Sequence, residues 1–186
     1  VPIILLINAG GAVELTDILE KTQWIKGIFN ISQLGQEGGR AVARILLGEA
    51  VPSGKLTTTW AKKYADMPFA ENFSYLNGNL ELEEYKEGIY IGYRYFDSFG
   101  VKPLFPFGFG LSYTDFEIQF CGIETDQDKI GVNVSVENTG SRFSGSEVVQ
   151  IYAVLPHGRL EKEHHRLVGY AKTNVLKPGE KQQVRI

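Results

Sequence analysis

The chain has 186 residues, of which 43% are hydrophobic and 22% charged, and its formal net charge is −3. These values are typical of a globular protein and exclude the disordered and collagen-like classes, and the length allows one ordinary domain and a second small one. The basic residues are scattered, so the basic patch of a nucleic-acid binder is missing and no nucleic-acid partner is expected. The apolar run at residues 1–7 is far shorter than the ~20 residues that span a bilayer, so no membrane insertion is expected.

Both ends of the chain have the pattern of strands. There is no initiator Met, residues 1–7 look like a buried strand already under way, and residues 182–186 begin the alternation of another strand. We therefore expect the chain to be a piece of a longer protein.

The first 60 residues alternate between apolar strands and helical segments. The continuous aliphatic run at residues 3–7 is typical of a strand that is covered on both faces in a parallel sheet. Strand, helix, strand, helix is the order of a parallel α/β unit. The expected elements are strands at 3–7, 24–31 and 56–60 and helices at 13–21 and 41–47.

The rest of the chain changes from loops to strands. Residues 61–115 are rich in aromatics and turn residues, which predicts a loop-rich stretch. From Phe116 the apolar residues alternate with polar ones, and short strands separated by turns without helices predict an immunoglobulin-like β-sandwich. The fold class is thus α/β followed by all-β, with a predicted α/β domain and connector at 1–115 and a truncated β-sandwich at 116–186.

Two glycine-rich turns follow the first two predicted strands, where ligands bind in open α/β sheets. Asn8 opens the first turn, and Gln36 and Glu37 lie in the second. Each turn also has a structural explanation, since glycine is the default in tight turns and an acidic residue at a helix start complements the helix dipole. The dinucleotide fingerprint G-x-G-x-x-G is absent, so a nucleotide-binding protein is the weakest alternative.

Residues 86–97 combine aromatic rings with charged residues. Four rings, at Tyr90, Tyr93, Tyr95 and Phe96, could form a platform on which a sugar stacks, but packing in a core or interface is the favoured interpretation. The prolines and glycines of 103–113 predict an extended connector with buried rings.

No metal or cofactor site is expected. His164 and His165 are adjacent, so on a strand they would point to opposite faces, and a solvated loop is the favoured interpretation. Cys121 is expected to be a small core residue rather than a nucleophile, and as the single cysteine it fits a reducing cytoplasm and also an exported enzyme. The G-x-S-x-G motif of serine hydrolases is absent.

Two long blocks resemble the family 3 glycoside hydrolases. Residues 87–97 read EGIYIGYRYFD and residues 103–114 read PLFPFGFGLSYT, in the order that the family has them. Shorter blocks at 8–11, 35–39 and 48–56 support the resemblance, and 136–140, 147–152 and 167–170 resemble the fibronectin III-like domain of many members. Two departures, at 33–35 and at Trp60-Ala61, affect the subgroup and not the family.

This resemblance implies a retaining hydrolase of β-glycosides, in particular β-D-glucosides, with a nucleophilic Asp and an acid/base Glu. In the family the Asp lies on an N-terminal barrel, and in most β-glucosidase-like members the Glu lies on a loop upstream of the Asn-x-Gly-Gly strand. Neither matches a position here. The resemblance therefore implies that this chain is inactive alone, docks on the barrel and helps to wall the cleft for a β-glycoside or oligosaccharide, with Asn8, Gln36, Glu37 and Glu87 as candidate cleft residues. The alternative is a non-catalytic carbohydrate-binding or structural module.

Overall fold

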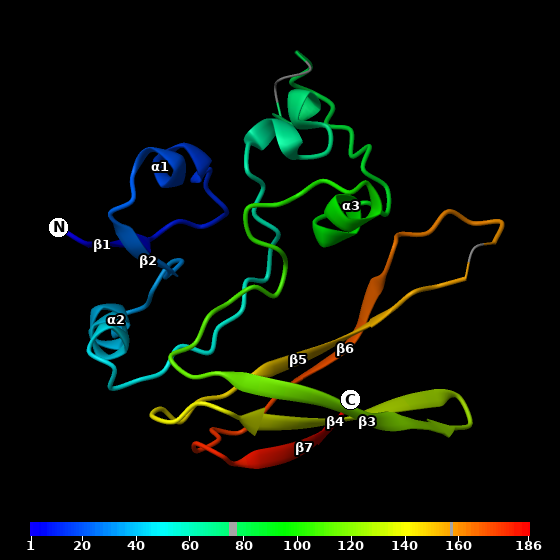
Figure 1. The fold of residues 1–186 in the computed structure, drawn as a ribbon. Coiled ribbons are helices and arrows are strands. Elements are labelled where there is room, and N and C mark those ends of the chain that lie inside the picture. Colours follow the sequence, from blue (N-terminus) through cyan, green and yellow to red (C-terminus); the bar gives the residue numbers. More distant parts are fainter. Residues whose placement is uncertain (75–77, 157) are drawn as a thin grey trace. The chain divides into compact units, whose positions relative to one another are not determined.

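The computed structural model describes residues 1–74, 78–156 and 158–186 (Figure 1). The chain divides into two compact units that interleave along the sequence. The first unit, called here the α/β unit, consists of Val1–Val42, Leu56–Gly108 and Leu155–His165. The second, called here the sandwich unit, consists of Ala43–Lys55, Phe109–Val154 and Arg166–Ile186.

The α/β unit begins with a parallel pair of strands joined by a helix. Strand β1 (Ile3–Ile7) pairs with β2 (Ile25–Asn30), and α1 (Thr16–Lys21) connects them. A parallel pair needs such a crossover, since its strands run in the same direction. Helix α2 (Gly38–Leu46) follows β2, as the sequence predicts.

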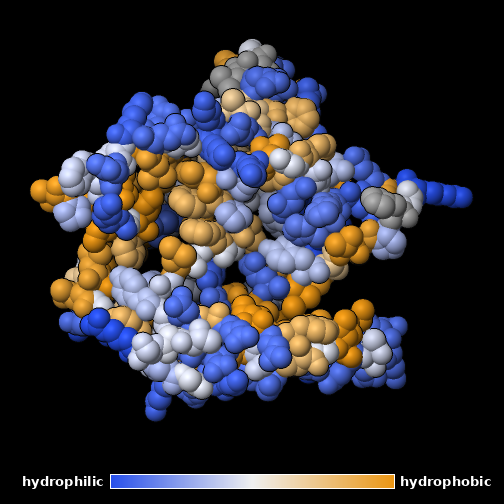
Figure 2. All heavy atoms as spheres, viewed as in Figure 1, coloured by the Kyte–Doolittle hydropathy of each residue, from blue (hydrophilic) through white to orange (hydrophobic). Residues whose placement is uncertain are grey.

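The faces of β1 are more exposed than its aliphatic sequence predicts. Ile4 is 52% exposed, and only Ile7 of this strand is fully buried, in a small core with Leu15 and Trp60. Hydrophobic residues reach the surface in the region of β1 and β2 (Figure 2). The expectation of a strand covered on both faces is wrong for the described residues, because a two-stranded sheet with short helices has too few elements to cover both.

The stretch after Leu56 holds the largest differences from the sequence-based expectation. The strand expected at 56–60 is reduced to a single bridge between Trp60 and Phe105. Within the predicted loop region lie the 3-10 turns η1 (Tyr64–Asp66) and η2 (Ala70–Asn72) and the helix α3 (Tyr93–Ser98). Helix α3 is only six residues long, too short for a periodic apolar pattern to reveal it.

The sandwich unit consists of two antiparallel sheets. One sheet has the order β3-β4-β7 and the other pairs β5 with β6. The apolar side chains of β4 and β7 pack against those of β5 around Val136, which is fully buried. This is the predicted β-sandwich. The strands are β3 (Phe116–Asp126), β4 (Lys129–Asn138), β5 (Val148–Ala153), β6 (Arg166–Lys172) and β7 (Lys181–Arg185).

Asn138 ends β4 and is fully buried. Its amide donates to the carbonyls of Phe143 and Leu176, at 2.9 and 2.8 Å. Its Oδ1 accepts hydrogen bonds from the Thr114 hydroxyl and the Gly140 N–H. Buried polar atoms require hydrogen-bond partners, and this one side chain forms hydrogen bonds with three backbone groups and one hydroxyl at the edge of the sandwich core.

Cys121 is exposed on β3, so its expected place in the core is wrong. The register of β3 against β4 shifts between Phe120 and Gly122, which leaves Cys121 at the bulge without a partner residue across the ladder. A bulge interrupts the alternation of inward and outward side chains, and the sequence pattern does not show where this occurs.

Candidate functional site

Two places in the α/β unit contain the candidate residues, and the first is the carboxyl edge of the parallel pair. Asn8 directly follows β1, while Gln36 and Glu37 precede α2 in the connection after β2. The Ile31 N–H donates to the Ile7 carbonyl at 2.9 Å, so the two strands end together. The loops after them therefore lie at one edge of the sheet, as parallel strands require.

All three of these side chains are open to solvent. The side chain of Glu37 is 74% exposed, and its only recorded partner within the described residues is Arg40, three residues on, at 3.7 Å. Such a surface pair contributes little to stability. Asn8 and Gln36 are likewise exposed. The edge offers polar groups on the surface rather than an enclosed site.

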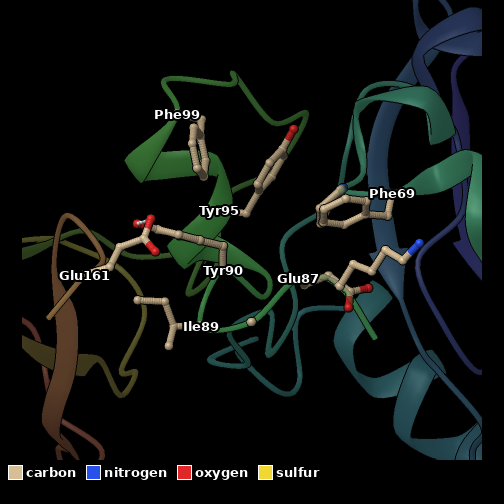
Figure 3. A pocket seen from close by; sticks show the side chains of 10 residues that line it. Phe69, Glu87, Ile89, Tyr90, Tyr95, Phe99 and Glu161 are labelled. Carbon is tan, nitrogen blue, oxygen red and sulfur yellow. Dashed lines mark hydrogen bonds between the residues drawn. The ribbon is translucent and has the colours of Figure 1, made fainter. Parts of the chain in front are cut away.

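Glu87 lies apart from this edge, in the wall of a cavity of about 460 Å³ beside α3. Figure 3 shows Tyr90, Tyr95 and Phe99 on one wall, with Phe69 approaching Tyr95 from the other side. The full lining is Pro68, Phe69, Lys86, Glu87, Gly88, Ile89, Tyr90, Tyr95, Phe99 and Glu161. Asn8, Gln36 and Glu37 do not line it.

Two glycines shape the segment that carries this wall. Gly88 and Gly92 have φ values of +59° and +57°. Residues with a side chain rarely adopt this left-handed region, whereas glycine enters it without steric cost. The glycines of the EGIYIGY block therefore have a backbone role, and they place Tyr90 and the first turn of α3 beside the cavity.

The chain segment at 155–165, which connects β5 to β6, contributes the last wall residue. The Tyr90 hydroxyl donates to Glu161 Oε1 at 2.9 Å. This hydrogen bond and the negative charge of Glu161 raise the pKa of Tyr90, because the carboxylate favours the protonated phenol over the phenolate. The ring is thus held at a fixed place by its polar end.

The same segment makes further polar contacts with α3. Arg94 Nε lies 3.7 Å from Oε1 of Glu163, whose side chain is completely buried. His165 Nε2 lies 3.1 Å from Asp97 Oδ2, and the His165 ring stacks on Tyr93. The expected solvated loop at His164 and His165 is therefore wrong for His165, which packs against the helix. In the part of the chain that the structure describes, no three His, Cys, Asp or Glu side chains are grouped to hold a metal.

The sequence left two interpretations of the aromatic residues at 90–96 open, packing in a core and a surface on which a ligand stacks, and the rings differ in which one they fit. Phe96 is 1% exposed and belongs to the interior, and Tyr93 packs between Phe107 and His165. Tyr90 and Tyr95 instead line the cavity. Phe69 and Glu161 were not predicted as wall residues, since both come from segments far from 86–99 in the sequence.

No helix among the described residues has the length and apolar character needed to cross a membrane.

Comparison with known proteins covers both units. The profile of the glycosyl hydrolase family 3 C-terminal domain matches residues 1–113, and that of the fibronectin type III-like domain matches residues 147–186. The β-glucosidase A of Butyrivibrio fibrisolvens is 41% identical over 99% of this chain and 24% of its own length, and a β-glucosidase of Ruminococcus albus is 41% identical over 98% of this chain and 19% of its own.

A solved structure, β-glucosidase 3B of Thermotoga neapolitana in complex with glucose, matches 100% of this chain and 25% of its own, at 40% identity and a TM-score of 0.91. This chain therefore spans about a fifth to a quarter of the length of these relatives. The profile of the family's C-terminal domain covers more than half of the residues. The chain therefore belongs to glycosyl hydrolase family 3.

Proposed function

We propose that this chain is part of a longer retaining hydrolase of terminal β-glycosidic bonds, with β-D-glucosides as substrates. The observation that carries the proposal is the match of nearly the whole chain to proteins named β-glucosidase, at about two identical residues in five. A structure bound to glucose is among the similar ones. Hydrolysis with retention proceeds through a covalent glycosyl-enzyme formed by one carboxylate and assisted by a second.

We infer that the chain alone is inactive and that it supports the reaction by docking on a catalytic barrel and walling part of the substrate cleft. Exposed apolar residues of β1, such as Ile4, are suited to burial against another part of the protein. The sheet edge with Asn8, Gln36 and Glu37 is one surface that would approach the cleft, and Glu87 is a further candidate. Of the two carboxylates that line the cavity, Glu161 accepts the Tyr90 hydrogen bond.

A panel of nitrophenyl glycosides tests this proposal. The chain and the full-length gene product that contains it would be assayed side by side. We expect that only the longer protein hydrolyses a β-glucoside. The glycoside that it hydrolyses fastest identifies the preferred sugar. Activity of the chain alone would contradict the proposal of a supporting part, and Glu37→Gln and Glu87→Gln would then be the first variants to test for loss of that activity.

We also propose that the chain consists of two domains, at 1–115 and 116–186. The family profiles, which end at 113 and begin at 147, are compatible with this division. Hydrogen exchange of the whole chain tests it, since two domains open as separate cooperative units. Opening of the whole chain as one cooperative unit would contradict it.

A further inference from the structure

The cavity beside α3 has the size of a small-ligand site. Its volume of about 460 Å³ lies within the ~300–1,000 Å³ that such sites occupy. Its lining comes from three parts of the α/β unit, at 68–69, at 86–99 and at Glu161. Aromatic rings form most of its apolar wall, as Figure 3 shows.

These rings form a connected surface that the core does not use. The Tyr90 and Phe99 centroids are 4.8 Å apart, and those of Tyr95 and Phe99 are 5.2 Å apart. Phe99, which directly follows α3, is 57% exposed and Phe69 is 42% exposed, whereas Phe96 within α3 is 1% exposed. Core packing therefore accounts for Phe96 and leaves Phe69 and Phe99 unexplained, since exposed rings forgo the stabilisation that burial would give.

The backbone at Phe69 is held in an unfavourable conformation. Phe69 has φ 53° and ψ 34°, in the left-handed region. For a bulky residue this costs about 1–3 kcal/mol, and such conformations cluster at sites that bind ligands. The consequence of the conformation here is that the Phe69 ring lies in the cavity wall opposite Tyr90 and Phe99.

Glu87 gives the cavity a carboxylate that is available for a ligand. Within the described residues no hydrogen bond or ion pair is recorded for this side chain, which is half-buried. By contrast, Lys86 pairs with Glu84 at 2.9 Å, and Glu161 accepts from Tyr90. A carboxylate accepts hydrogen bonds from neutral hydroxyls and disfavours an anion beside it.

We propose that this cavity binds a neutral pyranose sugar. The ring lies between Phe69 and Tyr95, where its C–H face contacts the aromatic surface, and its hydroxyls donate to Glu87. The combination of ring faces with a free acceptor matches a molecule that has an apolar face and polar edges. This binding goes beyond the proposed function, because it needs no catalytic carboxylate and is a property of the chain itself.

Titration with cellobiose, followed by the aromatic NMR resonances of the whole chain, tests the proposal. The Phe69, Tyr90, Tyr95 and Phe99 resonances should shift together, with a Kd on the order of 1 mM, since the cavity is open and has few polar groups. Unshifted resonances at a cellobiose concentration about ten times that Kd would overturn the proposal.

Two variants locate the site. Phe69→Gly removes the ring while glycine accepts the left-handed backbone, and Glu87→Gln keeps the shape while it removes the charge. Each should weaken cellobiose binding about tenfold, which corresponds to about 1.4 kcal/mol. Tyr85→Leu is the matched control, because Tyr85 is an exposed ring of the same segment that does not line the cavity.

Thermal unfolding verifies that each variant is folded. If Phe69→Gly does not fold, the affinity of Glu87→Gln for cellobiose alone tests the proposed site. Wild-type affinity in a folded Glu87→Gln together with a folded Phe69→Gly would place the sugar elsewhere and overturn the proposal. Hydrolysis by the longer protein is a separate readout. If this chain binds cellobiose but the longer protein hydrolyses no β-glucoside, only the proposed function is contradicted. If the longer protein hydrolyses β-glucosides but this chain binds no cellobiose, only the proposed sugar site is contradicted.

Discussion

The two units of the chain use their hydrophobic residues differently. In the sandwich unit apolar side chains of β4, β5 and β7 pack into one core, where Val136 is fully buried, while Ile118 and Phe120 on β3 stay exposed. In the α/β unit the buried core is smaller, and Ile4 on β1 and Phe69 and Phe99 at the cavity remain exposed. The first pattern is that of a unit held together by its own packing. The second is that of a unit with a smaller core of its own, in which the exposed rings at the cavity are available for contacts with other molecules.

The buried hydrogen-bond network of Asn138 gives the largest expected effect. Asn138→Asp replaces an amide that donates to two carbonyls with a carboxylate that faces them. At pH 7 a buried, unpaired charge results, and we expect a loss of about 4 kcal/mol or more in the free energy of unfolding of the sandwich unit.

Hydrogen exchange of β4 during urea titration measures this loss. Asn174→Asp, an exposed asparagine of the same unit, is the control and should change stability by less than about 0.5 kcal/mol. If Asn138→Asp unfolds at the same urea concentration as the wild type, the network contributes nothing to the stability of the sandwich unit. The contrast between the two units would then rest on apolar packing alone.

A pair of truncations compares the two kinds of apolar residue directly. Leu176→Ala creates a cavity at a side chain that is 2% exposed, with an expected loss of about 3 kcal/mol. Ile4→Ala removes a similar volume from the exposed β1 and should cost less than about 1 kcal/mol. Both tryptophans lie in the α/β unit, so their fluorescence follows that unit, while exchange at β4 follows the sandwich. Equal losses would refute the comparison.

The contact between Arg94 and Glu163 tests the connection of residues 155–165 to α3 inside the α/β unit. Arg94→Met removes a cation 3.7 Å from a fully buried carboxylate. We expect a loss of about 2 kcal/mol in the tryptophan-monitored transition, because the charge of Glu163 stays buried. Arg159→Met, on an exposed arginine of the same segment, should have no measurable effect.

A smaller effect is expected at alkaline pH. The hydrogen bond to Glu161 raises the pKa of Tyr90 in the folded state. A raised pKa means that the folded state holds the phenol proton more tightly, so its contribution to stability is present below about pH 10 and is lost as the pH rises through the raised value. The unfolding midpoint of the α/β unit should therefore decline more steeply above about pH 10 in the wild type than in Tyr90→Phe. Parallel curves would indicate that the hydrogen bond is not made in solution.

Local patterns explain why much of the fold was predictable. The aliphatic run of β1 and the alternation of β4 and β5 are typical of strands, and the EGIYIGYRYFD block carries the family resemblance. These features predicted the α/β unit, the sandwich and the family resemblance. Helix α3 and the bulge at Cys121 were missed, since a six-residue helix and an interrupted ladder leave no periodic signal.

The sequence by itself therefore determined the kinds of element, their order and the residue types that recur in the family. Only the tertiary structure decided which of those residues meet. Phe69 and Glu161 join Tyr90 and Glu87 in one cavity although Glu161 is 71 residues from Tyr90, and His165 packs on α3 rather than in solvent. The physical reason is that such contacts form through the folding of distant segments onto each other, and local propensity and periodicity carry no information about their pairing.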